Sequence, residues 1–310
     1  MGAAYQNILY EVKGPVGYVT LNRPEKMNAL SNNLRAEMIH ALKTAEGDPA
    51  VSVIVVRGAG RTFSAGYDIG GGRDAPADST YVHPVSRRPD VGSLRLGPVE
   101  WSHHVIDTNW VIWEIQKPVI AQIHGYCLAG GTELATMCDL RIVAEDAIIG
   151  YPPVRAMTTM DNMWAPWHLP MAKAREFAYL GDAITGKEMA HWGWANKAVP
   201  AERLQATVDE FAHRLSLIDQ QMLIYSKRSV NRAYEVMGIR TALYAGADIQ
   251  ALSSIRPQGG VFAAISAERG LKAALQWRDG PFADYGTHGK KTERRPEDLP
   301  KSRPAARGNY

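Results

Sequence analysis

Short apolar runs typical of strands alternate with helical patterns in the first half of the chain, and this alternation constrains the fold more than any other feature. The strand-like runs cover residues 16–22, 51–57, 118–123 and 140–144, and the helix-like runs cover 31–46 and 131–138. Strands separated by helices are usually joined by crossover connections, which build a sheet covered by helices. The pattern therefore predicts an α/β core.

Helical patterns dominate after about residue 170. The predicted helices are 171–180, 186–194, 201–217, 220–236 and 238–254. We therefore divide the chain into a core (1–200), a helical C-terminal region (201–285) and a tail (286–310). The tail carries seven Lys or Arg and three Asp or Glu, so it holds a net charge of +4 while the whole chain has +3. The body is left at −1, which gives no general electrostatic case for nucleic acid.

Residues 70–100 interrupt the alternation. They are rich in Gly, Pro, Ser and charged residues and show no periodicity. A loop of this length inside a compact domain is usually a functional lid or is disordered. His83, Trp101, His103, His104 and Trp110 lie in or beside it, and we expect most of them to pack the lid.

Composition limits the setting in which the chain works. With 310 residues and 45% hydrophobic content it can bury a large core. It has no apolar run near the roughly 20 residues that span a bilayer, and its first residues lack the pattern of a signal peptide. Cys127 and Cys138 show no disulfide or metal-site spacing. We expect a cytoplasmic protein without a membrane partner or a metal.

The segment His124-Gly125-Tyr126-Cys127-Leu128-Ala129-Gly130-Gly131-Thr132-Glu133-Leu134 carries the clearest chemical signal. Its Gly-Gly pair separates a strand-like run from a helix-like run. A helix N-terminus presents unpaired N–H groups, and glycine lets a ligand approach them closely. Such a turn can hold an oxygen that becomes negative during a reaction, and the Glu133 carboxylate is one turn away.

An ordered set of motifs resembles the crotonase superfamily, also called the enoyl-CoA hydratase/isomerase family. The matching segments are Leu21-Asn22-Arg23-Pro24, Asn28-Ala29-Leu30, Phe63-Ser64-Ala65-Gly66-Tyr67-Asp68, Lys117-Pro118-Val119-Ile120-Ala121, His124 to Asp139, Gly181-Asp182 and Ser229-Val230-Asn231. They cover residues 5–280 in the family's order and spacing. The resemblance implies a repeated ββα superhelix and a helical C-terminal region that assembles trimers or dimers of trimers. It also implies acyl-CoA substrates, with coenzyme A as part of the substrate and no permanently bound cofactor.

The resemblance also implies roles for single residues. The two backbone N–H donors of the family's oxyanion hole map onto Tyr67 and Gly130. Glu133 aligns with the first catalytic glutamate of the hydratases; the alternative is a helix-start Glu that only interacts with the helix dipole. For the nucleotide, family positions near the phosphates and adenine map onto Arg23, Lys26 and the loop 65–69, in which we select Ala65, Asp68 and Ile69.

The chain departs from the hydratases at the second glutamate. That position is Pro153, which cannot transfer a proton. Asp161, eight residues further on, is the expected substitute, because some isomerases and hydrolases of the family place an aspartate there; the alternative is a cap or turn residue. Tyr151 and Arg155 are secondary candidates for the pocket.

These residues favour an acyl-CoA enzyme that stabilises an enolate or oxyanion. We expect a hydratase or isomerase reaction, with the length of 70–100 suggesting a bulky or cyclic acyl group. The alternative is a CoA-dependent hydrolase that cleaves a C–C or thioester bond. A non-catalytic or RNA-binding relative is disfavoured, because the basic tail has no aromatic residue for base stacking before Tyr310.

Overall fold

The computed structural model describes residues 5–69, 99–256 and 258–285, whose strands form two sheets. The larger sheet has the order β1 (Ile8–Lys13), β2 (Val16–Leu21), β3 (Val53–Gly58), β5 (Val119–Ile123), β7 (Leu140–Ala144), β10 (Lys197–Val199). The smaller sheet has the order β4 (Thr62–Ser64), β6 (Tyr126–Leu128), β8 (Ile148–Gly150), β9 (Ile184–Thr185). The terminal pairs β1–β2 and β8–β9 are antiparallel, and the other neighbouring strands are parallel.

The chain steps repeatedly from the larger sheet to the smaller sheet and then to a helix. β3 and β4 are followed in the described residues by α2 (Val99–Glu114), and β5 and β6 are followed by α3 (Gly130–Met137). β7 and β8 lead through the 3-10 turn η3 (Pro152–Arg155) to α4 (Ala165–His168) and α5 (Met171–Leu180). This ββα succession confirms the predicted α/β class.

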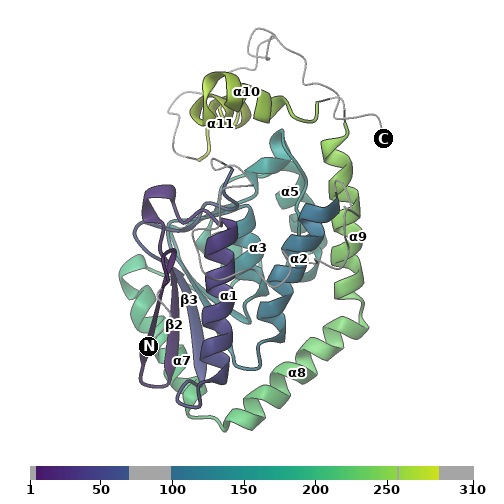
Figure 1. The fold of residues 1–310 in the computed structure, drawn as a ribbon. Coiled ribbons are helices and arrows are strands. Elements are labelled where there is room, and N and C mark those ends of the chain that lie inside the picture. Colours follow the sequence, from purple (N-terminus) through teal and green to yellow (C-terminus); the bar gives the residue numbers. More distant parts are fainter. Residues whose placement is uncertain (1–4, 70–98, 257, 286–310) are drawn as a thin grey trace.

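Burial explains why the central strands read as continuous apolar runs. The Val53–Val56 part of β3 is fully buried, as expected for a parallel strand covered on both faces. α1 (Asn32–Gly47) packs against β1 and β2, while α7 (Leu204–Ser216) packs against β3, β5 and β7 (Figure 1). The predicted cap of α1 is present, because Ser31 accepts a hydrogen bond from the N–H of Leu34 at 3.2 Å.

The helical C-terminal region forms as predicted. It contains η4 (Ala201–Arg203), α7, α8 (Gln220–Val236), α9 (Ile239–Ala251), η5 (Leu252–Ser254), α10 (Val261–Arg269) and α11 (Leu271–Asp279), while α6 (Gly186–His191) and β10 precede it. Residues 101–110, beside the predicted lid of 70–100, form α2 together with the last two lid residues, and Trp110 stacks on Trp113 with ring centroids 5.3 Å apart. The predicted lid at 70–98 and the tail at 286–310 lie outside the described residues.

α8 has a different environment from the other helices. None of its residues is buried, and with α9 it forms a long arm along one side of the molecule (Figure 1). Its exposed large apolar side chains are Met222, Tyr225, Val230, Tyr234 and Val236. A helix with this many exposed apolar residues marks a surface suited to association.

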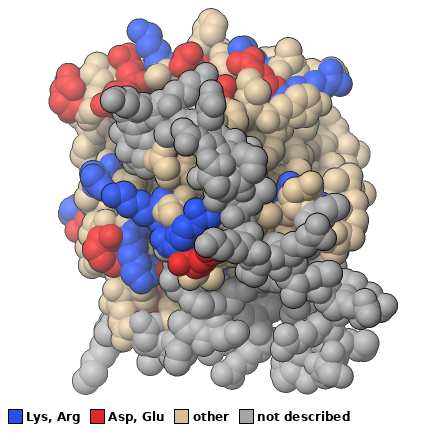
Figure 2. All heavy atoms as spheres, turned by 90° about the horizontal axis from the view of Figure 1, so that it is seen from above, with Lys and Arg blue, Asp and Glu red and all other residues tan. Residues whose placement is uncertain are grey.

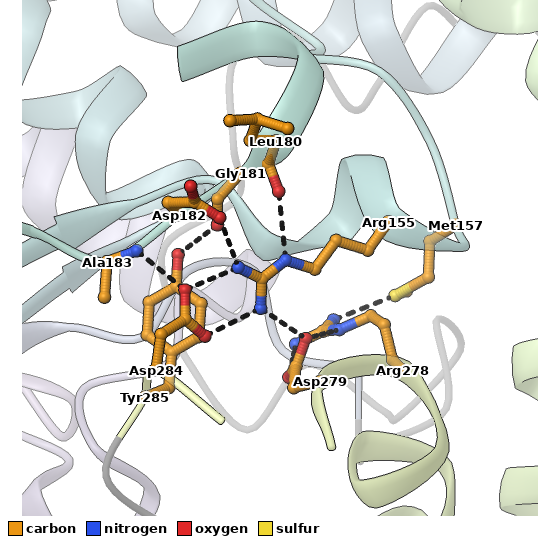
Figure 3. Close-up of polar contacts among 10 residues, drawn as sticks. All are labelled: Arg155, Met157, Leu180, Gly181, Asp182, Ala183, Arg278, Asp279, Asp284 and Tyr285. Carbon is orange, nitrogen blue, oxygen red and sulfur yellow. Dashed lines mark hydrogen bonds and ion pairs between the residues drawn. The ribbon is translucent and has the colours of Figure 1, made fainter. Parts of the chain in front are cut away.

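An ionic cluster joins the end of the chain to the core. Arg155, whose side chain is 1% exposed, contacts Asp182 at 3.0 Å and Asp284 at 2.5 Å, and its Nε donates to the carbonyl of Leu180 (Figure 3). The hydroxyl of Tyr285 donates to the carbonyl of Gly181 at 2.5 Å. These contacts hold residues 284–285 against the turn after α5.

A small apolar cluster lies next to this ionic cluster. It consists of Phe262 and Ile265 from α10 and Ala274 from α11, with Met157 packed against it. α10 and α11 thereby form a small unit above the rest of the molecule (Figure 1). Asp279 at the end of α11 lies 3.6 Å from Arg155, so both clusters attach these helices to η3.

Charges of both signs occupy the visible upper face. Lys and Arg gather in one area of it, with Asp or Glu beside them, and acidic and basic groups alternate along the far edge (Figure 2). Among the described helices, none is long and apolar enough to cross a membrane.

Candidate active site

Two turns that are distant in sequence contact each other at the start of α3. A Cβ added to Gly66 would lie 2.8 Å from the Ala129 Cβ and 3.1 Å from the Gly130 nitrogen, so the turn before Tyr67 lies directly against the turn before Gly130. Ala129 has a φ of 48°, an unusual value for a residue with a side chain, and its N–H donates to the carbonyl of Gly150 at 2.9 Å. The predicted pair of oxyanion donors is thus brought together.

Close packing explains both glycines of the motif. A Cβ on Gly130 would lie 2.5 Å from the Tyr67 ring, and one on Gly131 would lie 2.7 Å from the carbonyl oxygen of Ser64. Any larger residue at either position would push these groups apart. In the described part of the chain, neither the Tyr67 N–H nor the Gly130 N–H donates to a backbone carbonyl, so both can bind a ligand oxygen.

Glu133 lies fully buried on the first turn of α3. Its Oε2 accepts a hydrogen bond from the Tyr67 hydroxyl at 2.7 Å, and its Oε1 accepts one from the backbone N–H of Asn162 at 3.1 Å. The two oxygens are therefore held by donors from opposite sides. The two hydrogen bonds fix the carboxyl group, and its position at the N-terminus of α3 is favourable for a negative charge.

Asp161 is also buried and lies next to the residue that holds Glu133. Ser102 on α2 donates to its Oδ1 at 3.0 Å, and the Tyr151 hydroxyl is 3.5 Å from its Oδ2, at the outer limit of hydrogen bonding. The Ser102 hydroxyl is also 2.5 Å from Oε1 of Gln250, which comes from α9. The C-terminal helical region therefore reaches the predicted site.

The environment separates the pKa values of the two acids. Burial raises the pKa of Glu133 to about 8, with a further contribution from the charge of Asp161, while hydrogen bonds from Tyr67, Asn162 and Tyr151 oppose the rise. Burial also raises the pKa of Asp161, to about 6, against the effect of hydrogen bonds from Ser102, Trp101 and Tyr151 and of the Arg35 charge. The rise is larger for Glu133 than for Asp161, so the surroundings favour the protonated form at Glu133 more than at Asp161.

Arg35 provides a positive charge beside the two acids. It is 2% exposed, donates to Thr108 at 2.6 Å, and its guanidinium carbon lies 5.5 Å from the ring centroids of both Tyr67 and Trp101. Burial and this charge lower the pKa of His104 to about 3, so His104 is neutral at physiological pH. We therefore assign no proton transfer to His104.

The predicted nucleotide-binding residues divide into two groups. Arg23 and Asp68 form an ion pair at 2.9 Å with side chains only 12% and 13% exposed, so these two side chains bind each other. Lys26 and Ile69 are exposed, and the N–H of Ala65 donates to the carbonyl of Met27 at 3.0 Å. Of the five, Lys26 has the chemistry and exposure that suit a phosphate.

The two secondary candidates for the pocket, Tyr151 and Arg155, lie in different surroundings. Tyr151 is buried beside Asp161, whereas Arg155 belongs to the ionic cluster at the end of the chain. Pro153 is buried in η3 and only its carbonyl oxygen makes polar contacts, accepting hydrogen bonds from the N–H groups of three following residues. The structure therefore contains no carboxyl group at the position of the second hydratase glutamate.

Sequence reasoning missed Arg35, Ser102 and Gln250. Arg35 had a signal: it precedes Met38, Ile39 and Leu42 by three, four and seven residues, so it lies on the buried stripe of its helix. A charge in that stripe indicates a buried polar site. Ser102 and Gln250 had no such signal, because 148 residues separate them along the chain.

A cavity of about 520 Å³ lies elsewhere, between the C-terminal end of α3 and α8. Its lining includes Asp139, Lys227 and Arg141, but none of the residues around Glu133. Asp139 and Lys227 pair with each other at 2.8 Å, and Arg141 donates to three backbone carbonyls. The ion pair and these backbone hydrogen bonds already satisfy the charged groups of the cavity. The described residues contain no group of three or more His, Cys, Asp or Glu that could hold a metal ion.

Known proteins resemble this chain over most of its length. A sequence model of the enoyl-CoA hydratase/isomerase family matches residues 16–242. The putative enoyl-CoA hydratase EchA13 of Mycobacterium tuberculosis is 30% identical over 293 residues, covering 89% of this chain and 90% of that protein.

Solved structures of enoyl-CoA hydratases are also similar to this chain in fold and sequence. An enoyl-CoA hydratase/isomerase from Xanthobacter autotrophicus Py2 has 33% identity and a TM-score of 0.77, with 89% of this chain and 98% of the other covered. An enoyl-CoA hydratase from Mycobacterium smegmatis has 30% identity and a TM-score of 0.80, with 91% and 96% covered.

The two-sheet ββα fold and the paired N–H turns define an acyl-CoA enzyme of the crotonase type. The chain belongs to the enoyl-CoA hydratase/isomerase family.

Proposed function

We propose that the enzyme moves a proton on an acyl-CoA thioester through an enolate intermediate, and that its reaction is double-bond isomerisation of an enoyl-CoA. The observation that carries the proposal is the meeting of two buried acids, Glu133 and Asp161, at the turn 161–162, where burial raises the pKa of Glu133 further than that of Asp161. One ionised and one protonated carboxyl group are what a proton shift between two carbons requires.

Each group has one task in the proposed cycle. The Asp161 carboxylate takes a proton from a carbon of the acyl chain, and the electron pair of that C–H bond moves toward the thioester carbonyl. The carbonyl oxygen becomes negative and is held by the N–H groups of Tyr67 and Gly130. Glu133 then gives its proton to a different carbon, which restores the carbonyl and leaves the double bond shifted.

At the end of the cycle the protonation states of the two acids are the reverse of those at the start. Asp161 is then protonated and Glu133 ionised, so one proton must return. The Tyr151 hydroxyl lies 3.5 Å from Asp161 and also serves as a donor toward Glu133. We assign Tyr151 to this return, because a hydroxyl can accept a proton from one carboxyl group while it donates its own to the other.

Hydration is the second candidate, favoured by the hydratase names of the relatives. It would require Asp161 to activate water in place of the acid missing at Pro153. Hydrolytic cleavage of a C–C or thioester bond is the third candidate reaction. The proposal of a bulky or cyclic acyl group rests on residues 70–100, of which 70–98 lie outside the described structure.

We also propose that Lys26 contacts a phosphate of coenzyme A, while the Arg23–Asp68 pair shapes the loop 65–69. The exposed apolar side chains of α8 support self-association, as a trimer or a dimer of trimers.

The test is a screen of enoyl-, dienoyl- and cyclic oxoacyl-CoA esters in D₂O, with products identified by mass. Isomerisation incorporates deuterium and adds no water to the product. Hydration adds the mass of one water, and hydrolysis releases a fragment or free coenzyme A. Glu133→Gln should lose at least about 100-fold in rate, and the exposed control Glu202→Gln should not. A wild-type enzyme that exchanges no proton with any ester would refute the enolate proposal.

A further inference from the structure

The side chain of Tyr67 crosses the first turn of α3 and reaches the carboxyl group of Glu133. Its hydroxyl lies 2.7 Å from Oε2, and its ring occupies the space that a Cβ of residue 130 would fill, 2.5 Å from the position of that atom. Residue 67 was expected to act through its backbone N–H alone. The same residue therefore presents two groups to the site, a backbone donor and a phenol.

Packing on several sides fixes the orientation of this phenol. The Trp101 ring meets the Tyr67 ring edge-on with centroids 5.2 Å apart, and the buried Arg35 guanidinium lies 5.5 Å from the ring centroid. Gly130 supports the ring from the helix side. A ring held on these sides keeps its hydroxyl in one place, so the hydrogen bond to Glu133 does not depend on a mobile side chain.

The hydrogen bonds of Glu133 determine where its proton sits. A backbone N–H can only donate, so Oε1, which faces the N–H of Asn162, is the accepting oxygen. The transferable proton therefore belongs on Oε2, the oxygen next to the Tyr67 hydroxyl. Burial and the nearby charge of Glu133 raise the pKa of Tyr67 well above its usual range, so the phenol remains protonated and does not act as a base.

We propose that the Tyr67 hydroxyl is the positioning group for Glu133, donating to Oε2 when the carboxyl is ionised and accepting from it when the carboxyl is protonated. The proposal rests on the proposed role of Glu133 as a proton carrier. The exchange of roles keeps Oε2 in one place through the cycle. Protonation of Glu133 also frees the phenol hydrogen to point at a bound acyl group.

Several other groups act on Glu133 and must stay constant in the test. Asp161 supplies a negative charge, Arg35 a positive one, and Asn162 and Tyr151 are donors. Tyr67→Phe removes only one oxygen and keeps the ring, the backbone N–H and these neighbours. Tyr126→Phe is the matched control, because its hydroxyl donates to the carbonyl of Tyr285, away from Glu133.

The experiment compares pH–rate profiles for deuterium exchange. The charge-assisted hydrogen bond to the ionised carboxylate is stronger than the bond to the protonated carboxyl, so the loss of both in Tyr67→Phe should move the Glu133 limb up by about one pH unit. We expect kcat to fall roughly 10-fold or more while KM stays within about 2-fold, because general acid–base steps depend on orientation. An unchanged profile with wild-type kcat would overturn the proposal.

A direct titration separates this proposal from the proposed function. The ¹³C carboxyl signal of Glu133, assigned by its loss in Glu133→Gln, is titrated in wild type, Tyr67→Phe and Tyr126→Phe. A higher midpoint only in Tyr67→Phe supports the positioning role even if no tested ester reacts. Equal midpoints in all three proteins overturn it, even if the enzyme turns over.

Discussion

Replacing Asp161 by Asn tests the proposed division of labour between the two acids. With pKa values of about 6 for Asp161 and about 8 for Glu133, the two interacting carboxyl groups share one proton in the range between these values. The smaller rise at Asp161 makes Asp161 the ionised member of the pair and Glu133 the protonated one, which is the state that the proposed cycle requires. The wild-type rate should follow a bell with its maximum near pH 7.

Asp161→Asn should change this bell in two ways. Loss of the base should lower turnover by about 10² to 10⁴-fold and remove the acidic limb. The negative charge of Asp161 is the second-largest cause that raises the pKa of Glu133, so the alkaline limb should move to lower pH.

The assay is deuterium exchange at the acyl group, measured from about pH 5 to pH 9 with one reactive ester. Asp146→Asn, on an exposed turn, serves as the control for loss of a carboxylate. An alkaline limb that stays in place, or moves up, would show that the charge of Asp161 does not act on Glu133. A flat wild-type profile would refute the assignment of both acids.

Three further changes follow from packing and charge. In Gly130→Ala the new Cβ would meet the Tyr67 ring at 2.5 Å, so we expect a loss of about 1–3 kcal/mol in unfolding free energy and slower exchange, measured by denaturant unfolding and kinetics. Arg155→Met leaves the partly exposed Asp284 without its cation, which should cost about 1–3 kcal/mol, and proteolysis or hydrogen exchange should show α10 and α11 opening first. Burial acts to raise the pKa of Asp284, but hydrogen bonds from Arg155 and the Ala183 N–H lower it on balance. The stability that the ionised Asp284 contributes is therefore fully present above the ordinary pKa of an aspartate and is lost as the pH falls through the lowered pKa. Val236→Glu places a charge on the exposed apolar face of α8, and light scattering should report a smaller assembly; an unchanged mass would exclude this face from the contact.

Much of the fold could be predicted because its signals are local. The strand-like run 53–56 is apolar because parallel strands are covered on both faces, and Ser31 marks a helix start because its hydroxyl satisfies a free N–H. α2, over Val99–Glu114, was absent from the predicted helices. Tertiary packing against α3 and α9 buries Val105, Ile106 and Trp110 of this helix.

The sequence by itself placed Gly130, Gly131 and Glu133 at a helix start, because a glycine pair between a strand-like and a helix-like run has a backbone chemistry that depends only on its neighbours. It also showed that Pro153 cannot serve as the second acid. Only the tertiary structure decided what surrounds Glu133. The Tyr67 hydroxyl comes from 66 residues earlier, and Gln250 approaches Ser102 from 148 residues later. Burial and hydrogen bonds between such distant residues set the pKa values of the two acids, and no local pattern records them.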